Sequence, residues 1–531
     1  MNFSRRELLA HLAAVPLSGL VGCGALGGYN FVGELLSPDF STGHRLRDGW
    51  QPPPPKSAAQ SHQVVIVGGG IGGLATAWQL DQNGIDDYVV LELADQPGGT
   101  ATSGSRDGFH YPWGAHYVPT PMQDNESLIE LFRQMGVIVG QQSDGRPIVS
   151  EQYLCREPEE RVFFQGHWIE GLYPTAGASP QDLEQLQRFR ELMRDWSTRR
   201  DAAGRRMFAI PMSRSSDDDL VRQLDNVSMS QWMTDQRFSS ARLRWLVDYS
   251  CRDDYGLTIQ QTSAWAGLFY FVSRLGGESA ESQAVITWPE GNGRVVNYLA
   301  QQTADRMRCS HAVTNIQRRD GHVHVRALDK QSSTTVDFTA KHVVFAAPQF
   351  LAPHLISDWK SSGRSVANFR YGGWVVANVF LSARPQESDG AMAWDNVIYD
   401  SRSLGYVVST HQTGLDHGAT VLTWYQPLLD DDPRVSRAEL MQLTWQDWVR
   451  VVVSDLRKAH PDLAPLIRRI DVMRWGHAMV QPRVGFVWSD QRRTASESLG
   501  RIHFAGTDLS GIALLEEAFD RGVQAANRCA V

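Results

Sequence analysis

Three glycines and one acid, Gly68, Gly70, Gly73 and Glu92, have the types and spacing that point most clearly to chemistry. Gly68 permits a tight turn, Gly70 lets a phosphate approach backbone N–H groups, and Gly73 lets a helix pack closely on a strand. A helix that starts at such a turn presents partial positive charge to phosphates. Glu92, roughly 20 residues after Gly73, can accept the hydroxyl groups of a ribose. The pattern predicts a dinucleotide site.

The elements that must position these residues are also visible in the sequence. The run 64–67 is typical of a buried parallel strand, residues 74–80 predict a helix, and 88–91 predict a second strand that leads into Glu92. A glycine-rich turn without a ligand is the alternative, but strand, turn, helix, strand and acid follow one another in the expected order. The other turn residues expected at the cofactor are Ile71 and Gly72.

The residues after Glu92 help to choose the cofactor. The turn itself does not separate NAD from FAD, and Glu92 disfavours NADP because a 2′-phosphate would meet a carboxylate. The segment 92–100, with its glycine pair, resembles the extended signature of the FAD-dependent amine oxidase superfamily, which includes monoamine and polyamine oxidases, protoporphyrinogen oxidase and phytoene desaturase. The resemblance implies FAD, with Gly98, Gly99 and Thr100 on the flavin side.

Further segments resemble motifs of the same superfamily, in the same order. They are 108–116, 286–293, 312–316, 343–348, 501–508 and 516–526. The resemblance implies cofactor contacts for Gly114, Ala115, His116, Val313, Gly506, Asp508, Glu516 and Ala518. The chain departs from the usual pattern at Pro112, where the family has Asp, and at Glu517, where it has Gly.

The reaction implied by this resemblance is hydride transfer from a substrate C–H bond to flavin N5, which needs no protein nucleophile. The segment 475–482 resembles an element close to the flavin, so Trp475 and His477 are the candidate catalytic residues. A neutral histidine can orient substrate or move a proton; a histidine bonded only to backbone is the alternative. Trp424 and Tyr425 are further candidates for the cavity wall.

Two family features are missing from the substrate half. Amine oxidases of this superfamily usually carry a lysine in the strand that matches 375–380, near Ala377, and monoamine oxidases place an aromatic residue where Leu514 stands. Both absences argue against a monoamine oxidase as such. Three classes of function remain: an amine or polyamine oxidase or dehydrogenase, a dehydrogenase or desaturase of an apolar substrate from a membrane, and a non-catalytic flavin-binding protein.

The predicted fold class is α/β, with a discontinuous Rossmann-like FAD-binding domain and an inserted α+β substrate domain. The chain of 531 residues is too long for a single core. We assign residues 62–122, 285–358 and 478–531 to the FAD-binding domain, and 123–284 and 359–477 to the substrate domain.

The N-terminus predicts export and membrane attachment. Ser4-Arg5-Arg6 is a twin-arginine pattern, and Leu20-Val21-Gly22-Cys23 has the form of a lipobox. We therefore expect residues 1–23 to be a twin-arginine signal, with lipidation at Cys23 and a periplasmic location. An uncleaved anchor is the alternative, although the apolar run is short. Residues 24–61, with four consecutive prolines, predict a stiff, exposed tether.

The composition of the chain restricts the kinds of molecule that the protein is expected to bind. The formal net charge of −8 and the lack of a basic patch argue against nucleic acid. Five cysteines without a C-x-x-C spacing, and histidines without ligand spacing, predict no metal site. We expect a small-molecule substrate, with oxygen or a quinone as electron acceptor.

Overall fold

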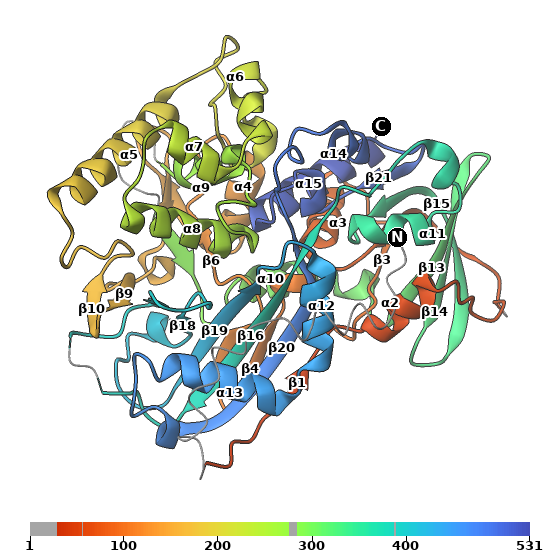
Figure 1. The fold of residues 1–531 in the computed structure, drawn as a ribbon. Coiled ribbons are helices and arrows are strands. Elements are labelled where there is room, and N and C mark those ends of the chain that lie inside the picture. Colours follow the sequence, from red (N-terminus) through yellow and green to blue (C-terminus); the bar gives the residue numbers. More distant parts are fainter. Residues whose placement is uncertain (1–28, 56, 276–283, 387–388, 531) are drawn as a thin grey trace, which may run out of the picture.

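The computed structural model describes residues 29–55, 57–275, 284–386 and 389–530. The predicted signal and Cys23 lie outside these residues. Within the described part of the chain, no helix is long and apolar enough to cross a membrane. The α/β prediction is confirmed: two large sheets and a group of helices make up the molecule (Figure 1).

A seven-stranded sheet carries the glycine turn. Strand β2 (Gln60–Val67) lies between β3 (Tyr88–Leu91) and β15 (Thr334–Phe345), parallel to both, and α3 (Ile71–Gln82) returns the chain across the sheet. Four consecutive β-branched residues form the buried half of β2, as expected for a strand covered on both faces. The order is β12-β3-β2-β15-β14-β13, and β21 (Ile502–Phe504) pairs with β15.

Distant parts of the chain complete this sheet. Strands β12 (Met307–Arg308), β13 (His311–Arg319) and β14 (His322–Asp329) join from the middle of the chain, and β21 joins from its end. The last helix, α15 (Leu515–Cys529), packs on α3 so closely that a Cβ on Gly522 would lie 2.4 Å from the carbonyl oxygen of Gly72. The predicted domain limits stay predictions.

The second sheet has eight strands in the order β1-β20-β16-β19-β18-β17-β9-β10. Its centre is β16 (Tyr371–Leu381), between β19 (Thr420–Leu428) and β20 (Ile467–Val480). Helices α12 (Pro433–Gln442) and α13 (Trp445–Leu456) cover one face. The other face carries a cluster of large aromatic residues. The remaining strands are β1 (Leu35–Leu36), β9 (Glu160–Phe164), β10 (His167–Glu170), β17 (Asp395–Ile398) and β18 (Tyr406–Val408).

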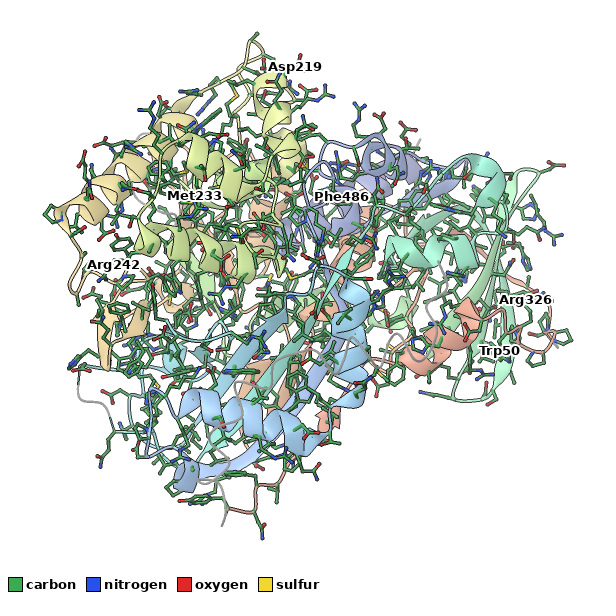
Figure 2. The ribbon with its side chains drawn as sticks, in the orientation of Figure 1. Trp50, Asp219, Met233, Arg242, Arg326 and Phe486 are labelled. Carbon is green, nitrogen blue, oxygen red and sulfur yellow. The ribbon has the colours of Figure 1, made fainter. Side chains whose placement is uncertain are left out.

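The helical part stands apart from both sheets in Figure 1. Its main helices are α5 (Pro180–Thr198), α6 (Asp219–Arg222), α7 (Met229–Asp235), α8 (Ala241–Tyr255) and α9 (Ala264–Ser273). Met233 is fully buried among these helices, whereas Asp219 lies at their outer edge (Figure 2). Shorter elements connect the parts: α4 (Glu126–Gln134), α10 (Gly293–Gln302), α11 (Ala352–Leu355), α14 (Asp490–Ala495), β4 (Ser103–Arg106), β5 (Phe109–Pro112), β6 (Tyr117–Pro119), β7 (Ile138–Gln141), β8 (Pro147–Val149) and β11 (Val285–Thr287).

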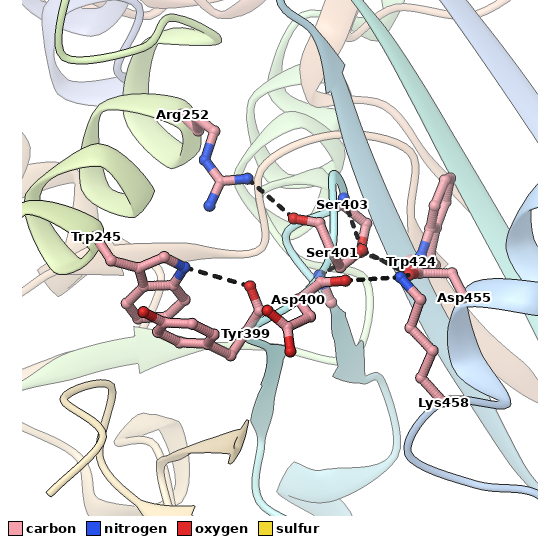
Figure 3. Close-up of polar contacts among 10 residues, drawn as sticks. Trp245, Arg252, Tyr399, Asp400, Ser401, Ser403, Trp424, Asp455 and Lys458 are labelled. Carbon is pink, nitrogen blue, oxygen red and sulfur yellow. Dashed lines mark hydrogen bonds and ion pairs between the residues drawn. The ribbon is translucent and has the colours of Figure 1, made fainter. Parts of the chain in front are cut away.

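A buried acid fixes the loop between β17 and β18. Asp455 on α13 accepts hydrogen bonds from Ser401, Ser403 and the indole of Trp424, and Lys458 pairs with it at 2.9 Å (Figure 3). From the helical side, Trp245 and Arg252 donate to backbone carbonyls of the same loop. This loop therefore couples α8 to the sheet and holds β17 in place.

The predicted tether is partly wrong. Strand β1 pairs in parallel with β20. Helix α2 (Phe40–Arg47) packs against α11, and its N-cap residue Asp39 accepts a hydrogen bond from Thr42 N–H. Even the proline run is attached, since Thr335 donates to the carbonyl of Pro53 at 2.6 Å. Leucines 35 and 36 can add a parallel strand because β20 is longer than its neighbours and leaves an edge to be covered.

Candidate functional site

The glycine turn and the Gly98-Gly99 pair, separate in sequence, form one loop assembly. Gly98 N–H donates to Gly69 O at 2.9 Å, and Gly70 and Gly98 form an isolated parallel bridge. A Cβ on Gly73 would lie 1.9 Å from Gly68 O, so no other residue fits there. The N-cap of α3 is Gly70, which has no side chain to bond the first N–H groups of the helix. Those donors remain available to a phosphate.

Glu92 lies beside the glycine turn, the position from which an acidic residue binds the ribose hydroxyls in dinucleotide sites. Its carboxylate accepts from Gly69 N–H at 2.6 Å and from Ala94 N–H at 2.8 Å, which holds it beside the turn. Burial raises its pKa, and the backbone hydrogen bonds oppose that rise. The start of β13 is tied to the same place, because His311 N–H donates to Glu92 O. Val313 follows at a bulge in β13.

A third loop closes on the Gly98–Thr100 segment. A Cβ on Gly114 would lie 1.9 Å from Thr100 O, and Asn292 N–H donates to Ala115 O at 3.0 Å. Thr287 donates to His116 O at 3.0 Å. The motif at 286–293 therefore positions the motif at 108–116. Ala115, Gly99 and Thr100 are nevertheless exposed, so a ligand can reach these loops.

The C-terminal motif approaches from the other side. A Cβ on Gly72 would lie 3.0 Å from Gly506 N, and Asp508 accepts from Gln349 N–H at 2.7 Å and from the Tyr371 hydroxyl at 2.6 Å. The N-terminus of α15 has no side-chain cap, and one oxygen of Glu516 in its first turn is buried without a hydrogen-bond partner. Ala518 is buried where α15 packs against the α3 side. The N-termini of α3 and α15 lack side-chain caps, glycines lie against the backbone at the turn, and one buried oxygen of Glu516 has no hydrogen-bond partner. These features are compatible with a bound dinucleotide.

An aromatic wall stands beside His116. Its Nδ1 lies 3.2 Å from the hydroxyl of Tyr425, which donates to Gly114 O, and its ring packs against Trp394 and Tyr117. Burial lowers the pKa of His116 to about 3, so the ring is neutral. The structure therefore brings together His116 and Tyr425, both named from the sequence, and adds Trp394, which sequence reasoning missed.

Three carboxylates meet behind this wall. Glu160 and Asp395 lie directly opposite each other on the parallel strands β9 and β17, and Asp253 on α8 interacts with both. Like charges in such positions repel each other. Among the residues that the structure describes, none of the three has an ion-pair partner, whereas the neighbouring Asp254 pairs with Arg274 at 2.7 Å. Nothing in the sequence pointed to this group, because its members lie far apart along the chain.

Desolvation and repulsion by neighbouring acids change how these acids titrate: Glu159 and Glu157 act on Glu160, Asp254 and Glu160 act on Asp253, and Asp253 and Glu160 act on Asp395. The pKa of Glu160 and that of Asp253 rise to about 7, and that of Asp395 rises well above its ordinary value. Glu160 is exposed, and Asp253 and Asp395 are partly accessible, so all three side chains border space that a ligand can enter. A cation in that space would stabilise all three charged forms.

The two candidate catalytic residues do not lie together. The pairing of β16 with β20 shifts between Gly372 and Trp374, so β20 carries an irregularity around Gly476. Trp475 is buried in the inner aromatic cluster and donates to Trp113 O at 2.7 Å. His477 is exposed in a separate pocket, where its ring stacks on Phe350 at 4.3 Å. Regular alternation of side chains along β20 would have placed Trp475 and His477 on the same face of the sheet.

The missing lysine also has a structural context. Ala377 packs in the outer cluster beneath α13, whereas Trp374, Val376 and Asn378 lie on the inner face of β16. Asn378 donates to Pro112 O and accepts from Thr423, so its amide is used to hold the loop. Leu514 occupies the N-cap position of α15, where it makes no capping hydrogen bond, and its side chain packs on the helical core.

Glu517, the departure from the family glycine, links two parts of the molecule. Its carboxyl group accepts from Met212 N–H at 2.6 Å, and burial raises its pKa to about 8. We expect Glu517→Ala to lower the free energy of unfolding by about 1–3 kcal/mol, because a buried N–H loses its acceptor. Glu517→Gln keeps an acceptor and serves as the matched control in urea unfolding. Equal stability of the two variants would contradict this role.

One grouping bears on the predicted lack of a metal. Donor atoms of His342, His503 and Cys529 lie within 4.8 Å of one another. His342 and His503 share a hydrogen bond at 3.0 Å, and burial raises the pKa of the Cys529 thiol to about 12. Lys341, Arg501 and Arg528 are the charges nearest to these groups. A cationic neighbourhood disfavours a metal ion, so the absence of a metal site stays our prediction.

Comparisons with known proteins agree with this geometry. The sequence profile of the flavin containing amine oxidoreductase family matches residues 71–530. The oxidoreductase PigB of Serratia sp. is 24% identical over 298 residues, which span 51% of this chain and 41% of PigB. A putrescine oxidase variant superposes with a TM-score of 0.67 at 16% identity, covering 89% of this chain and 99% of that one. Cyclohexylamine oxidase from Brevibacterium oxydans gives 0.62 at 18%, covering 88% and 98%. These structures share the fold.

Proposed function

Because the chain belongs to the flavin-containing amine oxidoreductase family, we propose that it is an FAD-dependent enzyme that oxidises a cationic amine, diamines such as putrescine among its candidate substrates. The observation that carries the proposal is the group of three carboxylates, Glu160, Asp253 and Asp395, without a described ion pair beside the aromatic wall. Close charges of one sign repel each other at a cost that a ligand of opposite sign relieves. An apolar substrate would leave that cost unrelieved.

The chain's own residues divide the work. The turn at Gly68–Gly73 and the N-terminus of α3 would hold the pyrophosphate of FAD, and Glu92 would hold its adenosine ribose. Bound FAD supplies an acceptor for hydride from the carbon next to nitrogen. The carboxylates hold the cationic group of the substrate, and the rings of Tyr425 and Trp394 orient its alkyl chain. His116, being neutral, fixes the Tyr425 hydroxyl and adds no repelling charge.

We further propose that the enzyme works outside the cytoplasm, attached by a lipid at Cys23. The twin-arginine pattern and the lipobox support this, and twin-arginine export would carry the folded, FAD-loaded protein. Replacing Arg5-Arg6 by two lysines should leave the protein in the cytoplasmic fraction, and Cys23→Ala should release it from membranes. Fractionation that is unchanged by both would contradict the proposal.

The carboxylates predict how binding depends on pH. Below a pH of about 7, Glu160 and Asp253 are largely protonated and hold a cation weakly; above it they ionise, while an alkylammonium stays charged. We expect KM for a diamine to fall as pH rises from about 6 to about 8. Steady-state kinetics across this range checks it, with a neutral analogue as the control. A KM that rises or stays constant would contradict the assignment.

The function itself is tested by anaerobic reduction of the purified, flavin-loaded protein. A panel of monoamines, diamines and apolar alkyl compounds is added, and the absorbance of the oxidised flavin is followed. We expect bleaching by amines, and admission of air then separates an oxidase from a dehydrogenase. Bleaching by apolar compounds alone would point to the membrane-substrate class, and no bleaching by any compound would favour the non-catalytic class.

A further inference from the structure

The pocket that holds His477 has a volume of about 240 Å³, and Tyr371 forms part of its wall. Its floor is made of rings: Phe350 stacks on His477, Tyr371 meets both edge-on, and Phe369 adds a further wall. None of the residues expected at the cofactor lines it. The Tyr371 hydroxyl reaches Asp508, so a single side chain separates the pocket from the C-terminal cofactor motif.

The rim of this pocket is cationic. Arg370, Arg434 and Arg437 line it together with His354 and His477. Arg434 is neutralised by Asp432, which it contacts at 2.6 Å. Within the described ranges, Arg370 and Arg437 have no ion-pair partner, and Arg437 makes only a long hydrogen bond, 3.4 Å, to Tyr371 O. Two guanidinium groups thus face the same space with their charge uncompensated.

We propose that this pocket binds an organic anion with a flat aromatic body, its carboxylate between Arg370 and Arg437 and its ring on the Phe350–His477 stack. Guanidinium groups bind carboxylates through paired N–H donors, and aromatic floors favour a planar ligand. His477 lies beside Arg437; desolvation by the surrounding pocket and the charge of Arg437 lower its pKa to about 4, so its ring offers a neutral face for stacking. A cationic substrate would be repelled here, which separates this pocket from the carboxylate group.

The surroundings of Arg437 favour binding of an anion. It projects from the first turns of α12, and burial lowers its pKa because the charged form is poorly solvated there. The N-cap acid, Asp432, is occupied by Arg434 through several hydrogen bonds. A carboxylate in the pocket would provide the counter-charge that the described residues do not give to Arg437.

Calorimetric titration of the flavin-loaded protein tests the proposal. Benzoate is the probe; benzamide has the ring without the charge, acetate has the charge without the ring, and inorganic phosphate is an anion of another shape. We expect benzoate to bind at one site per chain, and each of the others at least about tenfold more weakly, as loss of one strong contact implies.

Variants decide whether the binding occurs at this pocket. Arg437→Gln and Arg370→Gln should each weaken benzoate about tenfold or more, with an unchanged flavin spectrum. Arg146→Gln, which changes an exposed arginine already paired with Asp144, is the matched control and should bind normally. If Arg437→Gln does not fold, Phe350→Ala removes the floor instead. Equal affinity for benzamide, binding unaffected by the pocket variants, or benzoate binding only to flavin-free protein would each overturn the proposal.

Discussion

Gly73→Ala is expected to yield protein without bound flavin. A Cβ at this position would lie 1.9 Å from Gly68 O, inside the turn proposed to hold the pyrophosphate, and backbone cannot move aside as a flexible side chain can. The turn must open, and the N–H groups at the start of α3 then no longer point toward the phosphates. We expect flavin retention to fall by at least about 100-fold, since several charge-assisted hydrogen bonds are lost together. The ratio of flavin to protein absorbance measures it.

The matched control is Gly43→Ala. Gly43 lies in α2, where an added Cβ would meet nothing within 4 Å. Alanine favours helix more than glycine does, so this variant should be at least as stable as the wild type and fully loaded with flavin. Normal flavin content in Gly73→Ala would contradict the placement of the cofactor at this turn.

Asp253→Asn is expected to impair amine binding while making the free protein more stable. Removing one of three close negative charges weakens the hold on a cation, and we expect KM for a diamine to rise about 10- to 100-fold, as loss of a charge-assisted bond implies. Without substrate, the same change relieves the repulsion by Asp254, Glu160 and Asp395. The carboxyl pKa is raised in the fold, so wild-type stability is lost as pH rises through about 7, and the gain is therefore largest above that pH.

The adjacent acid supplies the opposite control. Asp254 pairs with Arg274, so Asp254→Asn leaves a buried guanidinium without its partner and should lower stability. Steady-state kinetics and thermal unfolding at a pH of about 8 compare the two variants. If Asp253→Asn is destabilised like Asp254→Asn and its KM is unchanged, the carboxylates have a structural role and do not bind substrate.

The strand–turn–helix–strand unit that carries the glycine turn could be predicted from the sequence because its spacing is local. Gly68–Gly73 and Glu92 lie within one strand–helix–strand unit, where spacing along the chain fixes spacing in space. Motifs such as Gly98-Gly99 and Gly114 are also short: positive φ angles favour glycine at 98 and 99, and close packing on Thr100 O requires it at 114.

The substrate half could not be predicted in the same way. Glu160, Asp253 and Asp395 come from β9, α8 and β17, and only the pairing of β9 with β17 brings two of them face to face. The irregularity in β20 separated Trp475 from His477, although alternation placed them on one side. The attachment of β1 and α2 depended on an open sheet edge that only the assembled sheet reveals.

The central claim is that the bound flavin oxidises a cationic amine held by the three carboxylates. The most direct measurement is the anaerobic rate of flavin reduction by putrescine, compared with butylamine and with the diol of the same chain length. The account predicts rapid reduction by putrescine, slower reduction by butylamine, and none by the diol. Reduction by the diol as fast as by putrescine, or no reduction by either amine, would contradict it.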